Sequence, residues 1–250
     1  MFWLVRRVVA WIRTLAALVL VSGYTLIVGP PGIALALALN KPMILYQAAV
    51  YGVFLGLSVT GLRYRVEGDG DLLTDRAAIY CVNHSSNVEP PIIYVVLRRL
   101  FPHLQVIYKQ ELRRMPILPR CWDIGGFVPI DRKNREQSDQ AIEQAARNIR
   151  SGKSFLVFPE GTRSRTGELL PFKKGAFILA IKAQAPVVPV AIVGASQAMR
   201  KGSPVIWPAT LRVRIGRPVE TAGLTLDDRE RLSNEVRERI ASMLAAGPCA

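Results

Sequence analysis

Hydrophobic positions divide the chain into an apolar N-terminal part and a longer part of mixed character. No charged residue occurs from Thr14 to Leu39, and none occurs from Pro42 to Leu62. Each run approaches the ~20 apolar residues that cross the hydrocarbon core of a bilayer. Because proline interrupts helices, Pro30-Pro31-Gly32 predicts that a first helix, from about Val5 to Val28, ends there. A second apolar segment then follows from Ile33 to Leu62.

After residue 62 the pattern becomes that of an α/β domain. Short apolar runs alternate with helical stretches, which is typical of helices packed on a largely parallel sheet. We therefore expect the α/β class, with residues 1–62 forming a membrane-embedded helix pair and residues 63–250 a mostly parallel central sheet flanked by helices. The predicted strands are Ala77–Val82, Gln105–Tyr108, Phe127–Ile130, Phe155–Phe158, Val187–Ile192 and Leu211–Ile215, and the predicted helices are Pro91–Leu100, Glu136–Ser151, Lys174–Gln184 and Asp227–Ala246.

The charges that flank the apolar runs predict their orientation. Three arginines precede the first run, Arg63 and Arg65 follow the second, and only Lys41 lies between them. The positive-inside rule then places both ends in the cytoplasm, which predicts an active site at the cytoplasmic face of the inner membrane. A cleaved signal peptide is not favoured, because the apolar stretch exceeds an h-region of about 7–15 residues and a second one follows it. A two-span hairpin and a helix pair within one leaflet both remain open.

Composition narrows the class of partner. The chain has 33 Lys and Arg against 19 Asp and Glu, a net charge of +14. An anionic partner is therefore expected, and phospholipid headgroups, nucleotide-like groups, an acidic carrier protein and nucleic acid all qualify. Cys81, Cys121 and Cys249 form no CxxC pair, and the chain has only two histidines. These numbers predict a reducing compartment and neither a disulfide framework nor a zinc site.

Candidate chemistry begins in the stretch "NHSSNVEPP", which follows an apolar run ending at Val82. A strand that ends there places His84 at the carboxyl edge of the sheet, where open α/β sheets bind ligands. Glu89 could hydrogen-bond one ring nitrogen and leave the other free to accept a proton. However, Ser86-x-x-Glu89 also has the spacing of a capping box, in which Glu89 serves only helix N–H groups. These residues alone leave both interpretations open.

Three further stretches end or interrupt apolar runs: "GFVPIDR" at 126–132, "FPEGTRS" at 158–164 and "VVPVAI" at 187–192. In the second, Gly161 permits close backbone approach and Arg163 carries a planar fork suited to phosphate. Turn chemistry and an edge strand explain each stretch by itself.

Together and in this order, the four stretches resemble the four sequence blocks of the glycerolipid acyltransferase superfamily, and within it the bacterial 1-acylglycerol-3-phosphate acyltransferases. The resemblance extends from about Arg63 to Arg217. It implies a catalytic dyad in which His84 is the general base and Glu89, in place of the usual aspartate, orients it. It also implies that residues of the second and third blocks bind the acceptor's glycerol phosphate; these are Arg132, Glu160, Gly161, Thr162 and Arg163.

The resemblance further implies that the block around Pro189 serves the acyl donor or shapes the site, and that the N-terminal helix pair holds the active site at a membrane. Lys173, just after the third block, either assists acceptor binding or adds to a positive surface that faces anionic lipid. Either backbone N–H groups or the region of Asn83 and Ser85 are expected to stabilise the tetrahedral oxyanion. Cys81 lies inside a predicted strand, which favours a buried apolar role.

The resulting hypothesis is a membrane-bound acyltransferase of phospholipid biosynthesis. It would move an acyl chain from acyl-CoA or acyl carrier protein to the free hydroxyl of 1-acylglycerol-3-phosphate, giving phosphatidic acid. The scheme needs no metal or cofactor, and no nucleic acid partner is expected. Two alternatives remain open: the same chemistry on another lyso-lipid, such as a lyso-ornithine lipid, and a non-enzymatic, membrane-anchored lipid-binding protein.

Overall fold

The computed structural model describes residues 2–68, 72–131 and 133–246. Its seven-stranded sheet has the order β1-β7-β6-β2-β5-β3-β4, and all neighbouring strands run parallel except β6 and β7. The expected α/β class with a mostly parallel sheet is thereby confirmed. The strands are β1 (Arg63–Glu67), β2 (Ile79–Val82), β3 (Leu104–Lys109), β4 (Val128–Ile130), β5 (Ser154–Val157), β6 (Val187–Val193) and β7 (Thr210–Ile215).

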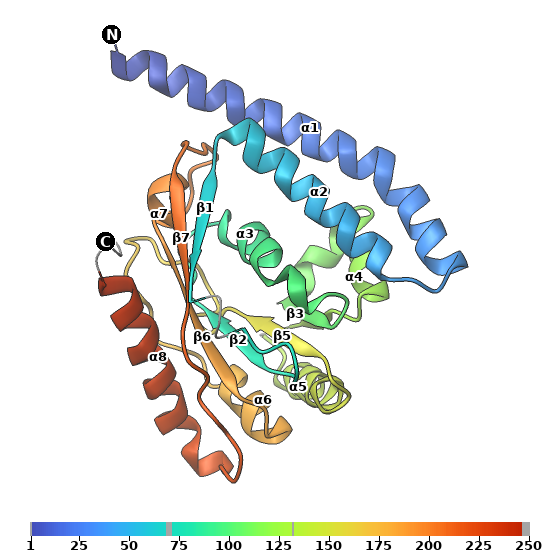
Figure 1. Cartoon of the computed structure of the whole chain (residues 1–250), viewed down its shortest axis with the longest axis vertical. Helices are drawn as coiled ribbons and strands as arrows, with labels where there is room; N and C mark the ends of the chain where they lie inside the picture. Colours follow the sequence, from blue (N-terminus) through green and yellow to red (C-terminus); the bar gives the residue numbers. More distant parts are fainter. Residues whose placement is uncertain (1, 69–71, 132, 247–250) are drawn as a thin grey trace.

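Helices cover both faces of this sheet (Figure 1). The strands β2 and β6 are central and almost wholly buried, which explains why they read as continuous apolar runs rather than alternating ones. One apolar cluster packs the sheet against α3, and a second packs its other face against α5, α6 and α8. The helices are α1 (Phe2–Ala38), α2 (Met43–Thr60), α3 (Glu89–Val96), α4 (Leu118–Ile124), α5 (Arg135–Arg150), α6 (Gly175–Ala183), α7 (Ala195–Ala198) and α8 (Arg229–Ala245), with 3-10 turns η2 (Leu97–Leu100), η3 (Gln110–Arg114) and η4 (Leu226–Asp228).

The N-terminal apolar region forms a hairpin of α1 and α2, and the break predicted at Pro30-Pro31 is wrong. Both prolines lie inside α1, and the chain turns between Ala38 and Met43 instead. A proline removes one helical hydrogen bond and bends the helix. In an apolar environment the backbone groups on either side of it have no other hydrogen-bond partners, so the helix continues through the prolines. Both helices are long and apolar enough to cross a membrane, by length and composition.

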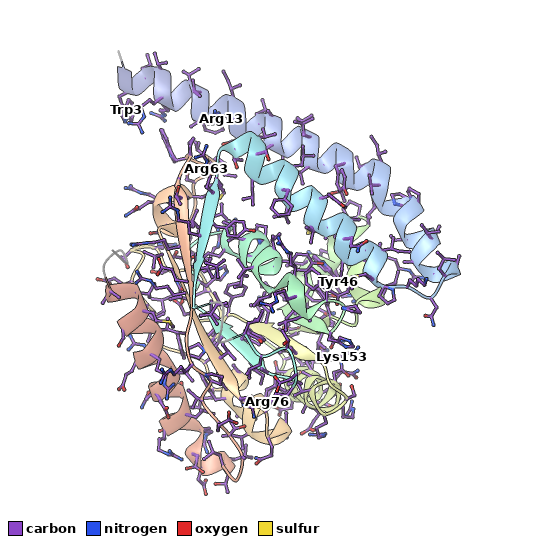
Figure 2. All side chains as sticks on the ribbon, in the orientation of Figure 1. Trp3, Arg13, Tyr46, Arg63, Arg76 and Lys153 are labelled. Atoms are coloured by element: carbon purple, nitrogen blue, oxygen red, sulfur yellow. The ribbon has the colours of Figure 1, made fainter. Side chains whose placement is uncertain are left out.

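The hairpin meets the sheet at a short junction. Gly61 closes α2 in the left-handed conformation, with φ 75°, and its N–H donates to the Leu57 carbonyl. Only Gly61 and the buried Leu62 separate α2 from β1. Because β1 runs parallel to β7 and β7 antiparallel to β6, the start of β1 lies at the edge where β2 and β6 end. Arg13 and Arg63 lie together at this junction (Figure 2), where they line one hollow.

Hydrogen bonds from Tyr46 and Thr14 attach the hairpin to the α/β part. The Tyr46 hydroxyl of α2 donates to the carbonyl of Leu104 at 2.6 Å, in a position between the hairpin and the sheet (Figure 2). The Thr14 hydroxyl of α1 accepts from the N–H of Ile206 at 2.9 Å. Most of the large apolar side chains of α1 remain exposed.

The buried Tyr46 bond provides a test of this attachment. Replacing Tyr46 with Phe leaves the Leu104 carbonyl without that donor, so we expect a loss of about 1 kcal/mol in the free energy of unfolding. Thermal unfolding of the full chain in detergent measures it. Tyr51→Phe is the matched control in the same helix, because Tyr51 is 68% exposed; equal effects of the two substitutions would contradict the attachment.

Candidate active site

The parallel arrangement of neighbouring strands gathers the candidate residues at one edge of the sheet. The strands β2, β5 and β6 are adjacent and parallel, so their carboxyl ends lie side by side. His84 follows β2 by two residues, and the turn at 159–164 follows β5 directly. Two stretches that are far apart in sequence therefore meet where open α/β sheets place their ligand sites.

His84 and Glu89 form a direct pair. The Nδ1 atom of His84 lies 2.8 Å from Oε2 of Glu89, whose side chain is 0% exposed. Ser85 holds the same carboxylate through its N–H, at 3.0 and 2.9 Å from the two oxygens, and through its hydroxyl at 2.6 Å. A carboxylate on Nδ1 selects the tautomer with the proton there and leaves Nε2 as an acceptor.

The capping interpretation of Glu89 is wrong for this chain. Helix α3 begins at Glu89, and its N-cap residue, Val88, makes no side-chain capping bond. The Ser86 hydroxyl bonds the N–H of Val88 and the carbonyl of Met199 instead. Glu89 turns back toward His84, and its place in the first turn still puts its negative charge at the positive end of the helix dipole.

The turn after β5 grips the peptide units on both sides of His84. Oε1 of Glu160 accepts from the His84 N–H at 2.5 Å, and the Ser164 N–H donates to the His84 carbonyl at 2.8 Å. The ring of Phe158, just before the turn, packs on the imidazole with centroids 4.4 Å apart. The backbone and ring of His84 are thus set by a segment that lies more than seventy residues later in the chain.

Glu160 has a different place from the one that the block resemblance implies. Its second oxygen, Oε2, accepts from the Leu170 N–H at 3.0 Å, and the residue is 3% exposed. Burial raises the pKa of the Glu160 carboxyl above its ordinary value, while the bonds from His84 and Leu170 oppose that rise. With each oxygen engaged by a backbone N–H, Glu160 holds the peptide groups of His84 and Leu170 in place.

The other predicted binding residues are spread along the same turn. Gly161 has φ 69°, a conformation that favours glycine, and the Thr162 side chain is exposed. Arg163 is half-buried, and its guanidinium makes no ion pair within the described part of the chain. Lys173 is exposed, and its N–H donates to the carbonyl of Pro159 at 2.8 Å. Arg132, predicted as a phosphate ligand, lies outside the described residues.

Several residues act at this site that the sequence patterns did not single out in these roles. The Asn83 amide spans to β6, where it accepts from the Ile192 N–H at 2.7 Å and donates to the Ile192 carbonyl at 3.2 Å. Lys201 bonds the turn at residues 162 and 163. These contacts join segments far apart in sequence, so no local spacing signals them.

The expected oxyanion donors are committed elsewhere. The N–H groups of His84 and Ser85 donate to carboxylates, and the Asn83 amide pairs with Ile192. Cys81 is fully buried, and burial raises the pKa of its thiol to about 12, which confirms an apolar packing role and excludes it as a nucleophile at neutral pH.

Known proteins are similar to this chain in sequence and fold. The sequence model of the family described as Acyltransferase matches residues 63–193. An uncharacterized acyltransferase of Schizosaccharomyces pombe is 33% identical over 199 residues, covering 78% of this chain and 70% of the relative. The 1-acyl-sn-glycerol-3-phosphate acyltransferase of Limnanthes douglasii is 33% identical over 202 residues, with the same coverage. The crystal structure of the 1-acyl-sn-glycerophosphate acyltransferase PlsC from Thermotoga maritima superposes with a TM-score of 0.82 at 23% identity, covering 96% of this chain and 97% of that chain.

Because Glu160 accepts one N–H on each oxygen, we expect Glu160→Gln to lose one of the two bonds. Glutamine offers one acceptor oxygen and turns an NH₂ donor toward the second N–H, so either His84 or Leu170 loses its partner. We expect a loss of about 1–3 kcal/mol in the free energy of unfolding, measured by thermal unfolding. Glu168→Gln, an exposed glutamate on the same loop, is the control; a Glu160→Gln protein as stable as this control would contradict the role.

Proposed function

Because the chain belongs to the acyltransferase family, we propose that it moves an acyl chain from a thioester to the free hydroxyl of 1-acylglycerol-3-phosphate, giving phosphatidic acid. The observation that carries this proposal is the His84–Glu89 bond of 2.8 Å at the carboxyl edge of the sheet. The relatives named 1-acyl-sn-glycerol-3-phosphate acyltransferase support the acceptor class. The thioester is carried by acyl-CoA or by acyl carrier protein.

His84 acts as the general base through Nε2. It accepts the proton of the acceptor hydroxyl while that oxygen attacks the thioester carbonyl, and the tetrahedral intermediate then expels the thiolate. The imidazolium returns its proton to the leaving sulfur, so that ester and free thiol are the products. The alcohol attacks directly, and no acyl-enzyme is formed.

Glu89 stabilises the imidazolium that forms during the attack. Its negative charge is fully buried and lies on Nδ1, where the low local dielectric strengthens the interaction with a positive ring. Ser85 holds two of its hydrogen-bonding positions, so the carboxylate needs no rearrangement when the ring becomes charged. The longer side chain of glutamate therefore serves in place of aspartate.

The acceptor phosphate binds to the cations on the turn after β5. Arg163 carries a guanidinium without an acidic partner in the described chain, and its fork suits two phosphate oxygens. Arg132 completes the clamp in this proposal. Gly161 keeps the turn open to a close approach of the headgroup. Lys173 adds positive charge at the rim.

The hairpin brings this chemistry to the cytoplasmic face of the inner membrane. Two facts support that placement: the exposed apolar side chains of α1, and the junction of α2 with β1 at the edge where His84 lies. The arginines Arg13 and Arg63 at the junction match the positive charge that favours a cytoplasmic, anionic membrane surface (Figure 2).

The experiment that tests the function measures thiol release from acyl-CoA and from acyl carrier protein. The acceptors are lysophosphatidate, a lyso-ornithine lipid and no acceptor. We expect release with lysophosphatidate and its loss in His84→Ala, with the fold of the variant intact by circular dichroism. Thiol release with the ornithine lipid alone would reassign the acceptor. The absence of acceptor-dependent thiol release with either lipid would refute the proposal.

Glu89→Gln tests the dyad itself. The amide NH₂ would donate to Nδ1 of His84, which moves the ring proton to Nε2 and removes the base. We expect turnover to fall by about 100-fold or more, with little change in the KM for either substrate. Glu89→Asp is the matched charge-retaining variant and should keep much more activity; equal activity of the glutamine variant and the native enzyme would leave Glu89 without a catalytic role.

A further inference from the structure

Lys201 is a cation at the site that belongs to none of the four sequence blocks. It follows α7, and its Nζ donates to the carbonyl of Arg163 at 2.7 Å and to the hydroxyl of Thr162 at 3.2 Å. Both bonds cross 38 or 39 residues of sequence, and both end on the turn that carries the proposed phosphate ligand. The lysine therefore fixes the backbone from which the Arg163 side chain extends.

The segment of Lys201 also touches the loop of the catalytic histidine. The hydroxyl of Ser86 donates to the carbonyl of Met199 at 2.8 Å, and the N–H of Ser164 donates to the carbonyl of His84 at 2.8 Å. Three segments are thus hydrogen-bonded in a closed ring: the His84 loop, the turn after β5, and residues 199–201. Lys201 therefore belongs to a segment that is hydrogen-bonded both to the His84 loop and to the turn after β5.

The positive charges of Lys201 and Arg163 have no negative partner within the described part of the chain. An ammonium has three N–H donors, and Lys201 uses two of them on neutral oxygens. Over the residues that the structure describes, neither Lys201 nor Arg163 pairs with a carboxylate. Lys201 Nζ bonds the backbone carbonyl of Arg163, so both residues belong to the same turn contact, and an anion bound there would attract both cations. A phosphomonoester is such an anion, and it also has oxygens for the remaining N–H of Lys201.

We propose that Lys201 is a phosphate ligand of the acceptor site, which donates its third N–H to the phosphomonoester while its other two hold the Thr162–Arg163 backbone. This inference rests on the proposed function and extends its phosphate clamp to a residue beyond the fourth block. Lys201 completes with Arg163 a two-cation site on the turn that follows β5.

The test compares Lys201→Met with Arg200→Met in the full chain. Both variants remove one positive charge from adjacent residues, but Arg200 makes no hydrogen bond to the turn among the described contacts. For Lys201→Met we expect the KM for lysophosphatidate to rise about tenfold, the value of one charge-assisted hydrogen bond. The turnover number and the thioester KM stay within about twofold, Lys201→Arg recovers most of the loss, and Arg200→Met behaves as native.

A phosphate-free acceptor separates binding from mere support of the turn. With monoacylglycerol of the same acyl chain, the penalty of Lys201→Met should disappear. An equal penalty with both acceptors would overturn the proposal and leave Lys201 a structural prop, and a raised thioester KM would assign it to the donor.

A binding arm makes the result independent of turnover. The probe is sn-glycerol 3-phosphate, titrated calorimetrically into detergent-solubilised full chain. Weaker binding to Lys201→Met than to Arg200→Met, with no acyl transfer by the native chain, would keep the phosphate site and refute the proposed function. Equal binding to the two variants would refute the role of Lys201.

Discussion

The site depends on two hydrogen bonds that hold the peptide units on either side of His84. A buried carboxylate takes the N–H, and a backbone N–H from the same distant turn takes the carbonyl. Neither bond can form until β2 and β5 lie side by side, because the partners come from the ends of those two strands. The position of the imidazole therefore depends on assembly of the sheet.

Two buried glutamates within this one site illustrate how surroundings divide the work. Glu89 faces a titratable ring and the hydroxyl of Ser85, so its charge can respond to proton transfer. Glu160 accepts from two backbone N–H groups, which do not ionise at neutral pH, so its carboxylate holds the positions of those peptide units. The same type of side chain thus bonds an imidazole in one place and a backbone in the other.

Much of the fold could be predicted from local pattern, because β2 and β6 are buried on both faces and read as unbroken apolar runs. The edge strand β1 escaped prediction, since its alternation of arginine with tyrosine and valine resembles a solvated linker until β7 pairs with it. The predicted end of the first helix was wrong, because the effect of proline on a helix depends on its surroundings, and apolar surroundings favour a continued helix. In the site, the residue pattern left both catalysis and capping open for His84 and Glu89, and only the resemblance of the four blocks favoured the dyad. The orientation of Glu160 and the contacts of Lys201 depend on long-range backbone partners that no motif records.

The two-residue junction between α2 and β1 has a consequence for how lipids are selected. Gly61 closes the helix, Leu62 is buried, and no slack remains for the sheet to tilt or rise independently of the hairpin. With the hairpin embedded as proposed, the short junction sets the height of His84 above the acyl chains. An acceptor would then be chosen partly by how far its free hydroxyl projects from the bilayer, and a change in membrane thickness would alter reactivity without touching a single residue of the site.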